Sequence, residues 1–260
     1  MRIATFNCNS VRKRLPLILA WLKENRPDVL ALQETKTEDA TFPEQAFVEA
    51  GWQAAYRGQK SYNGVALISR EPAEKMSFGL GDGDDGESEA RLIHGRYGKV
   101  DVVNTYVPQG RALDSPQFQF KLQWLRRLRA YFEREFGAAG QARAVWVGDL
   151  NVAPEPRDVH DSKKVWPHVC HCEPVIKAFR EVVDWGLTDV FRKHLPGDDV
   201  FTFWDYRVPN ALPRGLGWRI DQVLATPEQA RRSRDCRVDL EARRAESPSD
   251  HTFVVSDWDE

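Results

Sequence analysis

The segment at 144–154 constrains the fold of this chain more than any other. It opens with an apolar run at 145–147 that predicts a buried β-strand. Gly148 ends the run, and a carboxylate (Asp149) and a carboxamide (Asn151) follow directly. Side chains two apart in an extended chain face the same way, so both could address one ligand at the strand end. The alternative is an Asx-turn, in which both side chains bond only local backbone, and the segment alone leaves the two interpretations open.

Other short apolar runs carry polar residues at one end in the same way. Some polar groups lie at or just after the end of a run, and others lie just before a run begins. The first set is Asn7, Glu34, Tyr106, Asp149 and Asn151, and the second set is Asp221, Asp250 and His251. The two sets can share one edge only if the strands differ in direction. The chain therefore predicts mixed or antiparallel sheets covered by helices rather than a purely parallel sheet.

Between these runs, apolar residues at helical spacing predict four main helices. They cover 11–25, 43–50, 116–136 and 173–185, and the third has Ser115 as an N-cap and a Pro at its first position. No internal repeat, low-complexity linker or break in composition divides the sequence. We therefore expect residues 1–260 to form a single α/β domain.

Composition excludes several classes of protein. A net charge of −2 gives no global positive field, and four cysteines in 260 residues do not form a disulfide framework. No stretch approaches 18 consecutive apolar residues, and the start of the chain lacks the pattern of a signal peptide. We therefore expect a protein of the reducing cytoplasm that does not act at a membrane.

Two segments resemble metal-binding loops, but neither matches a known metal-binding pattern. The acidic run at 79–89 departs from the EF-hand template, because Ile93 stands where the last ligand should be, so we expect a loop between strands. The histidines and cysteines at 168–172 are packed too densely for structural zinc and lack a distant partner pair.

The segment at 201–219 mixes aromatic residues with Arg, Pro and Gly. Aromatic rings interleaved with Arg on a loop suit stacking on bases and contact with phosphates. A hairpin whose aromatic rings cover the core explains the same composition equally well.

Four carboxylates lie at strand ends: Glu34, Asp149, Asp221 and Asp250. Sites rich in carboxylates and free of thiolates suit hard divalent cations, Mg²⁺ first and Mn²⁺ as its substitute. Such ions support phosphoryl chemistry. The chain has neither a Gly-x-Ser-x-Gly elbow nor a Walker motif.

On these residues the chain resembles the exonuclease III family of apurinic/apyrimidinic (AP) endonucleases, within the endonuclease/exonuclease/phosphatase superfamily. The motifs that carry the resemblance occur in the family order, at 6–12, 32–36, 62–66, 106–110, 148–154, 204–207, 218–221 and 249–251. The resemblance implies a four-layer α/β sandwich of two packed mixed β-sheets flanked by helices. It also implies a monomer that uses magnesium to cleave the phosphodiester 5′ to abasic sites in duplex DNA. The 3′→5′ exonuclease and 3′-phosphatase or phosphodiesterase activities of relatives would extend the substrates to 3′-blocked ends.

The resemblance also implies roles for individual residues. The metal ligands would be Asn7, Glu34, Asp149, Asn151 and Asp250. Asp149 would orient or deprotonate the attacking water, while Asn151 would stabilise the transition state at the phosphate. Tyr106 would contact the phosphate or assist the leaving group. His251 would contact the same phosphate, with Asp221 fixing its tautomer.

A further set would contact DNA: Asn9, Arg111, Phe203, Trp204, Arg207, Trp218 and Ile220. Of these, Phe203, Trp218 and Ile220 match the family's pocket for a flipped abasic sugar. Arg111 and the loop at 207–219 would grip the DNA backbone or wedge into the duplex.

Two alternatives remain at this stage. A superfamily relative could act on a phospholipid, an inositol phosphate or general DNA, but it is not expected to share the turn at 106–110 or the aromatic loop. A non-catalytic DNA-binding module would have lost a site residue, and none is missing.

Overall fold

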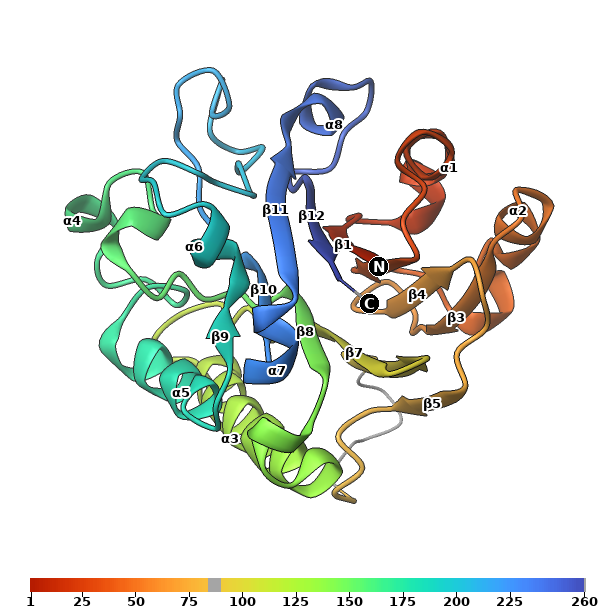
Figure 1. Cartoon of the computed structure of the whole chain (residues 1–260). Helices are drawn as coiled ribbons and strands as arrows, with labels where there is room; N and C mark the ends of the chain where they lie inside the picture. Colours follow the sequence, from red (N-terminus) through yellow and green to blue (C-terminus); the bar gives the residue numbers. More distant parts are fainter. Residues whose placement is uncertain (84–89, 260) are drawn as a thin grey trace.

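The computed structural model describes residues 1–83 and 90–259, and its strands form two six-stranded sheets packed face to face (Figure 1). Sheet one has the strand order β11 (Ser233–Asp239), β12 (Phe253–Trp258), β1 (Arg2–Asn7), β2 (Val29–Gln33), β4 (Val65–Ser69) and β3 (Gln53–Arg57). Sheet two has the order β5 (Lys75–Phe78), β6 (Leu92–Tyr97), β7 (Val100–Tyr106), β8 (Ala144–Asp149), β10 (Asp221–Ala225) and β9 (Thr188–Asp189).

Both sheets are mixed, and both follow the same pattern of strand directions. In sheet one β1 and β2 run parallel, and in sheet two β7 and β8 run parallel. The strands on either side of each central pair run antiparallel to their neighbours. The ends of β1, β2, β7 and β8 therefore share one edge of the molecule with the starts of β10 and β12. This confirms the mixed sheets predicted from the positions of the polar residues.

Helices cover the outer faces of both sheets and complete four layers (Figure 1). On sheet one lie α1 (Val11–Asn25) and α2 (Glu44–Glu49), and on sheet two lie α3 (Pro116–Phe136) and α5 (Glu173–Val183). The Ser115 hydroxyl accepts the Phe118 N–H and caps α3 as predicted. Shorter helices are α4 (Ser162–Val165), α6 (Val190–His194), α7 (Pro227–Arg231) and α8 (Leu240–Arg244), with 3₁₀ turns at Asp39–Thr41, Ala139–Gln141 and Pro156–Asp158.

The inner faces of the sheets follow the period of two that β-strands impose. Alternate residues of each strand pack into an apolar layer between the sheets, which includes Val29, Ala31, Val102, Val145, Val147 and Val223. Continuing the same alternation toward one edge gives buried polar residues instead, namely Asn7, Gln33, Asn104, Asp149 and Asp221. The core between the sheets thus becomes polar at the edge where the predicted site residues lie.

Several features differ from the sequence-based expectation. The edge strands β5 and β11 and the short helices α6, α7 and α8 have no counterpart in the prediction. Ser is a favoured residue directly before a helix, but the Ser10 side chain makes no capping bond to α1. Most of the loop expected at 79–89 lies outside the described residues.

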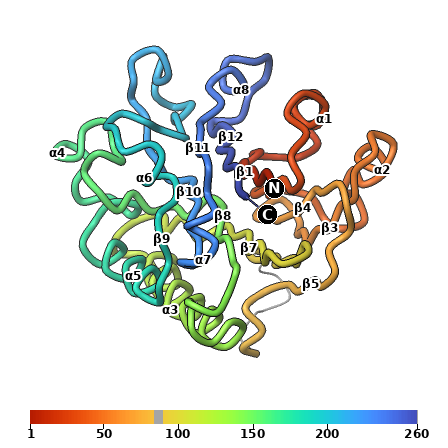
Figure 2. Tube along the Cα trace, in the orientation of Figure 1, coloured from red at the N-terminus to blue at the C-terminus, as the bar shows by residue number. Residues whose placement is uncertain are grey.

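The two ends of the described chain lie side by side in sheet one (Figure 2). The Met1 amino group donates to the Trp258 carbonyl oxygen at 2.8 Å, across 257 sequence positions. No helix in the described ranges is both long enough and apolar enough to cross a membrane.

Candidate active site

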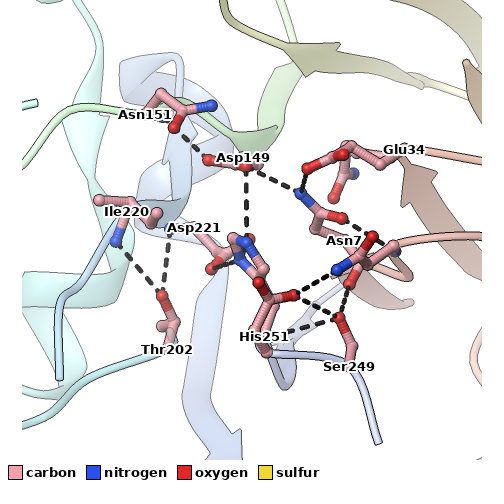
Figure 3. Close-up of polar contacts among 12 residues, drawn as sticks. Asn7, Glu34, Asp149, Asn151, Thr202, Ile220, Asp221, Ser249 and His251 are labelled. Carbon is pink, nitrogen blue, oxygen red and sulfur yellow. Dashed lines mark hydrogen bonds and ion pairs between the residues drawn. The ribbon is translucent and has the colours of Figure 1, made fainter. Parts of the chain in front are cut away.

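Six strand ends bring the predicted catalytic residues together at one edge of the sandwich (Figure 3). Strand register places Tyr106 and Asp221 opposite Asp149 on its two sides. Glu34 follows directly after β2, while His251 lies just before β12. Sheet one thus supplies one half of the site and sheet two the other.

The Asn7 side chain joins the two halves. Its Nδ2 donates to Glu34 Oε1 at 2.8 Å and to Asp149 Oδ2 at 2.9 Å. Its Oδ1 accepts the Asn9 N–H at 3.1 Å. Because an amide nitrogen carries two hydrogens, Asn7 can hold two carboxylates from opposite sheets close to each other.

Asp149 is almost fully enclosed, with 1% of its surface exposed. Its Oδ1 accepts the Asn151 N–H at 3.0 Å, which is the local Asx-turn that the sequence left open, while Oδ2 faces Asn7 and the other site residues. Burial raises the pKa of Asp149 to about 7, although His251 opposes the shift and the Asp221 and Glu34 charges add to it.

The glycine before Asp149 is required by close packing of β8 on β7. Gly148 has φ +139°, and a Cβ atom there would lie 2.0 Å from the Thr105 carbonyl oxygen. Only glycine allows this approach, which positions Asp149 next to Tyr106.

His251 pairs with Asp221, as predicted. Its Nδ1 lies 2.8 and 3.0 Å from the two oxygens of Asp221, and its Nε2 lies 3.8 Å from Asp149 Oδ2. Burial alone would lower the pKa of His251, but the Asp221 and Asp149 carboxylates outweigh it and raise the pKa to about 10. An imidazolium held in this orientation can donate from Nε2 to an anionic oxygen.

Tyr106 lies beside the same carboxylates. Burial raises its pKa well above the usual value, and the Glu34 and Asp149 charges raise it further. The phenol therefore keeps its proton and can act as a hydrogen-bond donor.

The donor set fits a hard divalent cation. Within the described residues, Glu34, Asp149 and His251 are the one group of three or more acidic, His or Cys side chains whose ligand atoms all lie within 4.8 Å of one another. Because His251 favours its charged form, the two carboxylates are the ligands that suit such an ion. Asp250, also predicted as a ligand, lies outside this group and accepts the Asn9 Nδ2–H at 2.9 Å.

Asn151 is placed differently from the extended arrangement that the sequence suggested. Its backbone has φ +50°, so the chain turns directly after β8. Its Nδ2 donates to the Val107 carbonyl oxygen at 3.0 Å, and its Oδ1 lies 3.8 Å from Cys170 Sγ. One amide hydrogen therefore holds the neighbouring strand end, and the other remains for a second acceptor.

Phe203, Trp218 and Ile220 come together beside the site, as expected. They pack in one apolar cluster with Ala153 and Val159, and the Phe203 ring lies 4.8 Å from the His251 ring. We call Phe203, Trp218 and Ile220 the apolar wall. It adjoins the catalytic group on the side of sheet two.

Two residues of the aromatic loop are buried, against the expectation of DNA contact. Trp204 is 4% exposed and packs on Phe201 and Ala211, so its indole supports the loop from inside. Arg219 is fully buried and bonds Asp158 and Asp189 through its guanidinium. Neither side chain offers a surface to DNA, and for the Trp204 ring the alternative of an aromatic residue packed inside the protein holds.

The other predicted DNA-contact residues lie at the rim. Arg207 has a side chain that is 90% exposed and pairs only with the neighbouring Asp205 among described residues. Arg111 is also exposed, on the turn after β7, with φ +57°. Asn9 bridges Asp250 and Lys36 on the side of sheet one.

Sequence reasoning missed several supporting residues. The Lys36 ammonium lies 2.7 Å from Glu34 Oε2. Lys36 belongs to the motif at 32–36, but no role was predicted for it. The Ser249 hydroxyl donates to the Asn7 carbonyl oxygen and accepts the His251 N–H. Lys121 is fully buried and donates to the carbonyl oxygens of Gln109, Asn151 and Val169. Lys121 falls in a basic stretch of α3 that resembles an ordinary solvated face, so no signal distinguished it.

The histidines and cysteines at 168–172 serve the loops next to the site. Cys170 lies against Asn151 and Lys121, and His171 bonds the Ala153 carbonyl oxygen and Ser162. The His168 ring packs on Trp218 at 4.8 Å.

Comparison with known proteins agrees with this geometry. Residues 4–251 match the model of the endonuclease/exonuclease/phosphatase family. Exodeoxyribonuclease III of Haemophilus influenzae is 30% identical over 270 residues, covering 99% of this chain and 100% of the relative.

Solved structures agree as well. An AP endonuclease from Archaeoglobus fulgidus is 47% identical with a TM-score of 0.96, and each chain is covered in full. The 3′ phosphatase NExo from Neisseria, bound to a product DNA hairpin, is 39% identical with a TM-score of 0.94, also with full coverage of both chains. The chain belongs to the endonuclease/exonuclease/phosphatase family, and within it to the exonuclease III and AP endonuclease group of nuclease hydrolases.

Proposed function

We propose that this DNA repair nuclease cleaves the phosphodiester 5′ to abasic sites in duplex DNA and also processes 3′-blocked ends. The observation that carries the proposal is the apolar wall of Phe203, Trp218 and Ile220 next to His251. A deoxyribose without a base can pack on such a surface once it leaves the helix, whereas a complete nucleotide needs more room. The similarity to an AP endonuclease and to a 3′ phosphatase supports both activities.

The residues divide the chemistry between them. Asp149, with a pKa near neutral, takes a proton from the attacking water. The His251 imidazolium and the free Asn151 amide hydrogen donate to the phosphate oxygens, and the Tyr106 phenol donates on the same side. Glu34 and Asp149, assisted by Asn7 and Asp250, would hold Mg²⁺ or Mn²⁺, which neutralises charge on the phosphate when bound.

Exposed groups at the rim would hold the DNA. Arg207 and Arg111 lie on turns at the edge of the site, where a guanidinium can contact phosphates or enter the duplex. The similarity to a bacterial exodeoxyribonuclease III supports action in the cytoplasm. That the acting form is a monomer is part of the proposal and follows from the family resemblance.

A cleavage assay tests the proposal. One labelled duplex carries a single tetrahydrofuran abasic analogue, and a matched duplex lacks it. Each is incubated with wild type, Asp149→Asn, Glu34→Ala and the surface control Glu49→Gln, with magnesium or with EDTA.

We expect one magnesium-dependent cut 5′ to the analogue by wild type and Glu49→Gln. The rate should fall at least about 100-fold in Asp149→Asn, since a positioned general base contributes about 10²–10⁴-fold. Stepwise shortening of both duplexes from their 3′ ends would make exonuclease the main activity. Folded wild type that cuts neither duplex would refute the proposal and direct attention to phospholipid and inositol-phosphate substrates.

A further inference from the structure

The two carboxylates of the site come from different sheets, so their spacing depends on how the sheets are held against each other. Glu34 follows β2 of sheet one and Asp149 ends β8 of sheet two, yet their ligand atoms lie within 4.8 Å. The layer between the sheets is largely apolar, and apolar contact is non-directional. Apolar packing alone would not fix one sheet against the other as closely as shared coordination of an ion requires.

Directional contacts between the sheets lie directly beneath the site. Asn104 of β7 donates from Nδ2 to the carbonyl oxygens of Leu32 and Ala66 in sheet one, at 2.9 Å each. Its Oδ1 accepts the Gln33 Nε2–H at 2.7 Å, and the same Nε2 donates to Thr5 Oγ1 at 2.9 Å. We call Thr5, Gln33 and Asn104 the inter-sheet clamp.

The clamp residues lie one or two positions from site residues, or opposite a residue that does, on both sheets. Gln33 directly precedes Glu34, so its side chain fixes the backbone from which that carboxylate extends. Asn104 lies two residues before Tyr106 and opposite Val147, which lies two residues before Asp149. The three clamp residues have no exposed surface, so solvent does not compete for these bonds.

Stability of the core alone does not explain the polar side chains of the clamp. Gln33 Oε1 is buried and has no hydrogen-bond partner among the described residues. A buried acceptor without a partner is unfavourable, and apolar side chains of the same shape would fill this space without that cost. The polar groups are therefore better explained by the position they impose than by the stability they add.

We propose that Thr5, Gln33 and Asn104 are positioning residues that set the spacing of Glu34 and Asp149 and thereby the affinity of the site for a divalent cation. This inference rests on the proposed function, because it assumes that the two carboxylates share an ion. The clamp touches neither the ion nor the DNA and acts only through the backbones of β2 and β7.

The test compares metal affinity with stability in the intact protein without DNA. Mn²⁺ binding is measured by isothermal titration calorimetry and the melting temperature by scanning calorimetry. The key variant is Gln33→Met/Asn104→Leu, which replaces both partners by apolar groups of similar shape and so avoids leaving one partner unpaired. Asn104→Leu alone is the destabilised comparison.

Two milder variants allow the test to be read even if the variants above do not fold. Thr5→Val removes one acceptor of the clamp. Thr226→Val removes a buried hydroxyl that bonds Ala142 and Ala144. This hydroxyl lies at the start of β8 and just after β10, at the ends of these strands away from the site. Both substitutions are the same, but only Thr5 belongs to the clamp.

We expect the Mn²⁺ dissociation constant of Gln33→Met/Asn104→Leu to rise about tenfold, in the range seen when groups behind metal ligands are removed. Its melting temperature should exceed that of Asn104→Leu. Thr5→Val should weaken Mn²⁺ binding, while Thr226→Val should lower the melting temperature and leave Mn²⁺ binding unchanged.

If the double variant and Thr5→Val both bind Mn²⁺ as tightly as wild type, the proposed role of the clamp is refuted. It is also refuted if Thr226→Val weakens Mn²⁺ binding as much as Thr5→Val does. A Glu34→Gln variant separates this failure from a failure of the proposed function. If wild type binds Mn²⁺ and Glu34→Gln does not, the metal site stands and only the clamp is judged. If neither protein binds Mn²⁺, the metal site is refuted and the clamp with it.

Discussion

The pKa values of three side chains at the site are raised, through two different causes. Burial is the main cause for Asp149 and for Tyr106, whereas His251 gains from the Asp221 and Asp149 carboxylates more than it loses by burial. The site thus offers His251 and Tyr106 as donors, and Asp149 as the group able to exchange a proton near neutral pH. A divalent cation bound at Glu34 and Asp149 would favour the carboxylate form of Asp149.

The Asp221→Asn variant tests the first part of this arrangement. Without the Asp221 charge, we expect the pKa of His251 to fall, so that the imidazolium loses its proton at a lower pH than in wild type. NMR titration of the His251 ring measures this directly, and the cleavage rate should fall about 100-fold or more because a positioned proton donor is lost. The exposed Asp235→Asn variant should change neither quantity. An unchanged His251 titration in Asp221→Asn would contradict the assignment.

At the scale of elements, a buried ion-pair network holds the apolar wall. Asp158, on the 3₁₀ turn after β8, accepts bonds from the guanidinium groups of Arg219 and Arg192. Arg219 lies between Trp218 and Ile220, and its backbone N–H also donates to the Asp158 carbonyl oxygen. The network therefore ties β9, α6 and this turn to the two wall residues.

Asp158→Asn should destabilise the protein by about 3–5 kcal/mol, because it removes the buried charge that the Arg192 and Arg219 guanidinium groups share. The free energy of unfolding in urea measures the change. Asp257 also pairs with two arginines, Arg2 and Arg237, but at the surface. Asp257→Asn should therefore cost no more than about 1 kcal/mol. Equal losses in both variants would show that burial does not set the strength of these pairs.

The same network predicts how stability depends on pH. Burial opposes ionisation of Asp158, but the Arg219 and Arg192 charges outweigh it and hold its pKa below the usual value. A depressed pKa in the folded state means that the contribution of Asp158 is complete above about pH 4 and is lost as the pH falls through the folded-state pKa. The difference in unfolding free energy between wild type and Asp158→Asn should be constant from pH 7 to 5 and shrink below pH 4. A difference that grows on acidification would contradict this sign.

Local patterns decided which elements could be predicted from the sequence. The bounds of α1 match its apolar stripe, and the central strands are apolar on both faces because helices and the other sheet cover them. The edge strand β11 reads Ser-Arg-Asp-Cys-Arg-Val-Asp and buries only Ser233 and Cys236, so it lacks the alternation that marks a strand. The short helices α6, α7 and α8 are too short to show a periodicity of their own. Side-chain caps stabilise α6 and α8, and α7 begins with a Pro in its first turn.

The site was predictable in part for the same reason. Polar residues at the ends of buried strands mark a shared edge, which sequence can reveal. Whether Trp204 and Arg219 point inward depends on the path of a loop that lacks periodicity. Arg219 and Arg207 are alike in sequence, but only Arg219 finds carboxylates inside the protein.

At the scale of the whole molecule, both sheets take part in more than one apolar cluster. One cluster lies between the two sheets, and one lies between each sheet and the helices that cover it. We therefore expect a single cooperative unfolding transition for residues 1–260. Scanning calorimetry should give equal calorimetric and van't Hoff enthalpies and a heat-capacity change of about 3–4 kcal/mol/K for a domain of this size. Two resolved transitions would contradict the single domain.

The pairing of β1 with β12 has a consequence for how the protein is made. β1 leaves the ribosome about 250 residues before β12, the strand that completes its other side and that directly follows Asp250 and His251. Until then sheet one has an open edge at β1, and the catalytic group lacks its imidazole. Nascent chains should therefore have no nuclease activity at any stage of elongation before the final strand emerges, and they would depend on chaperones to shield the exposed edge.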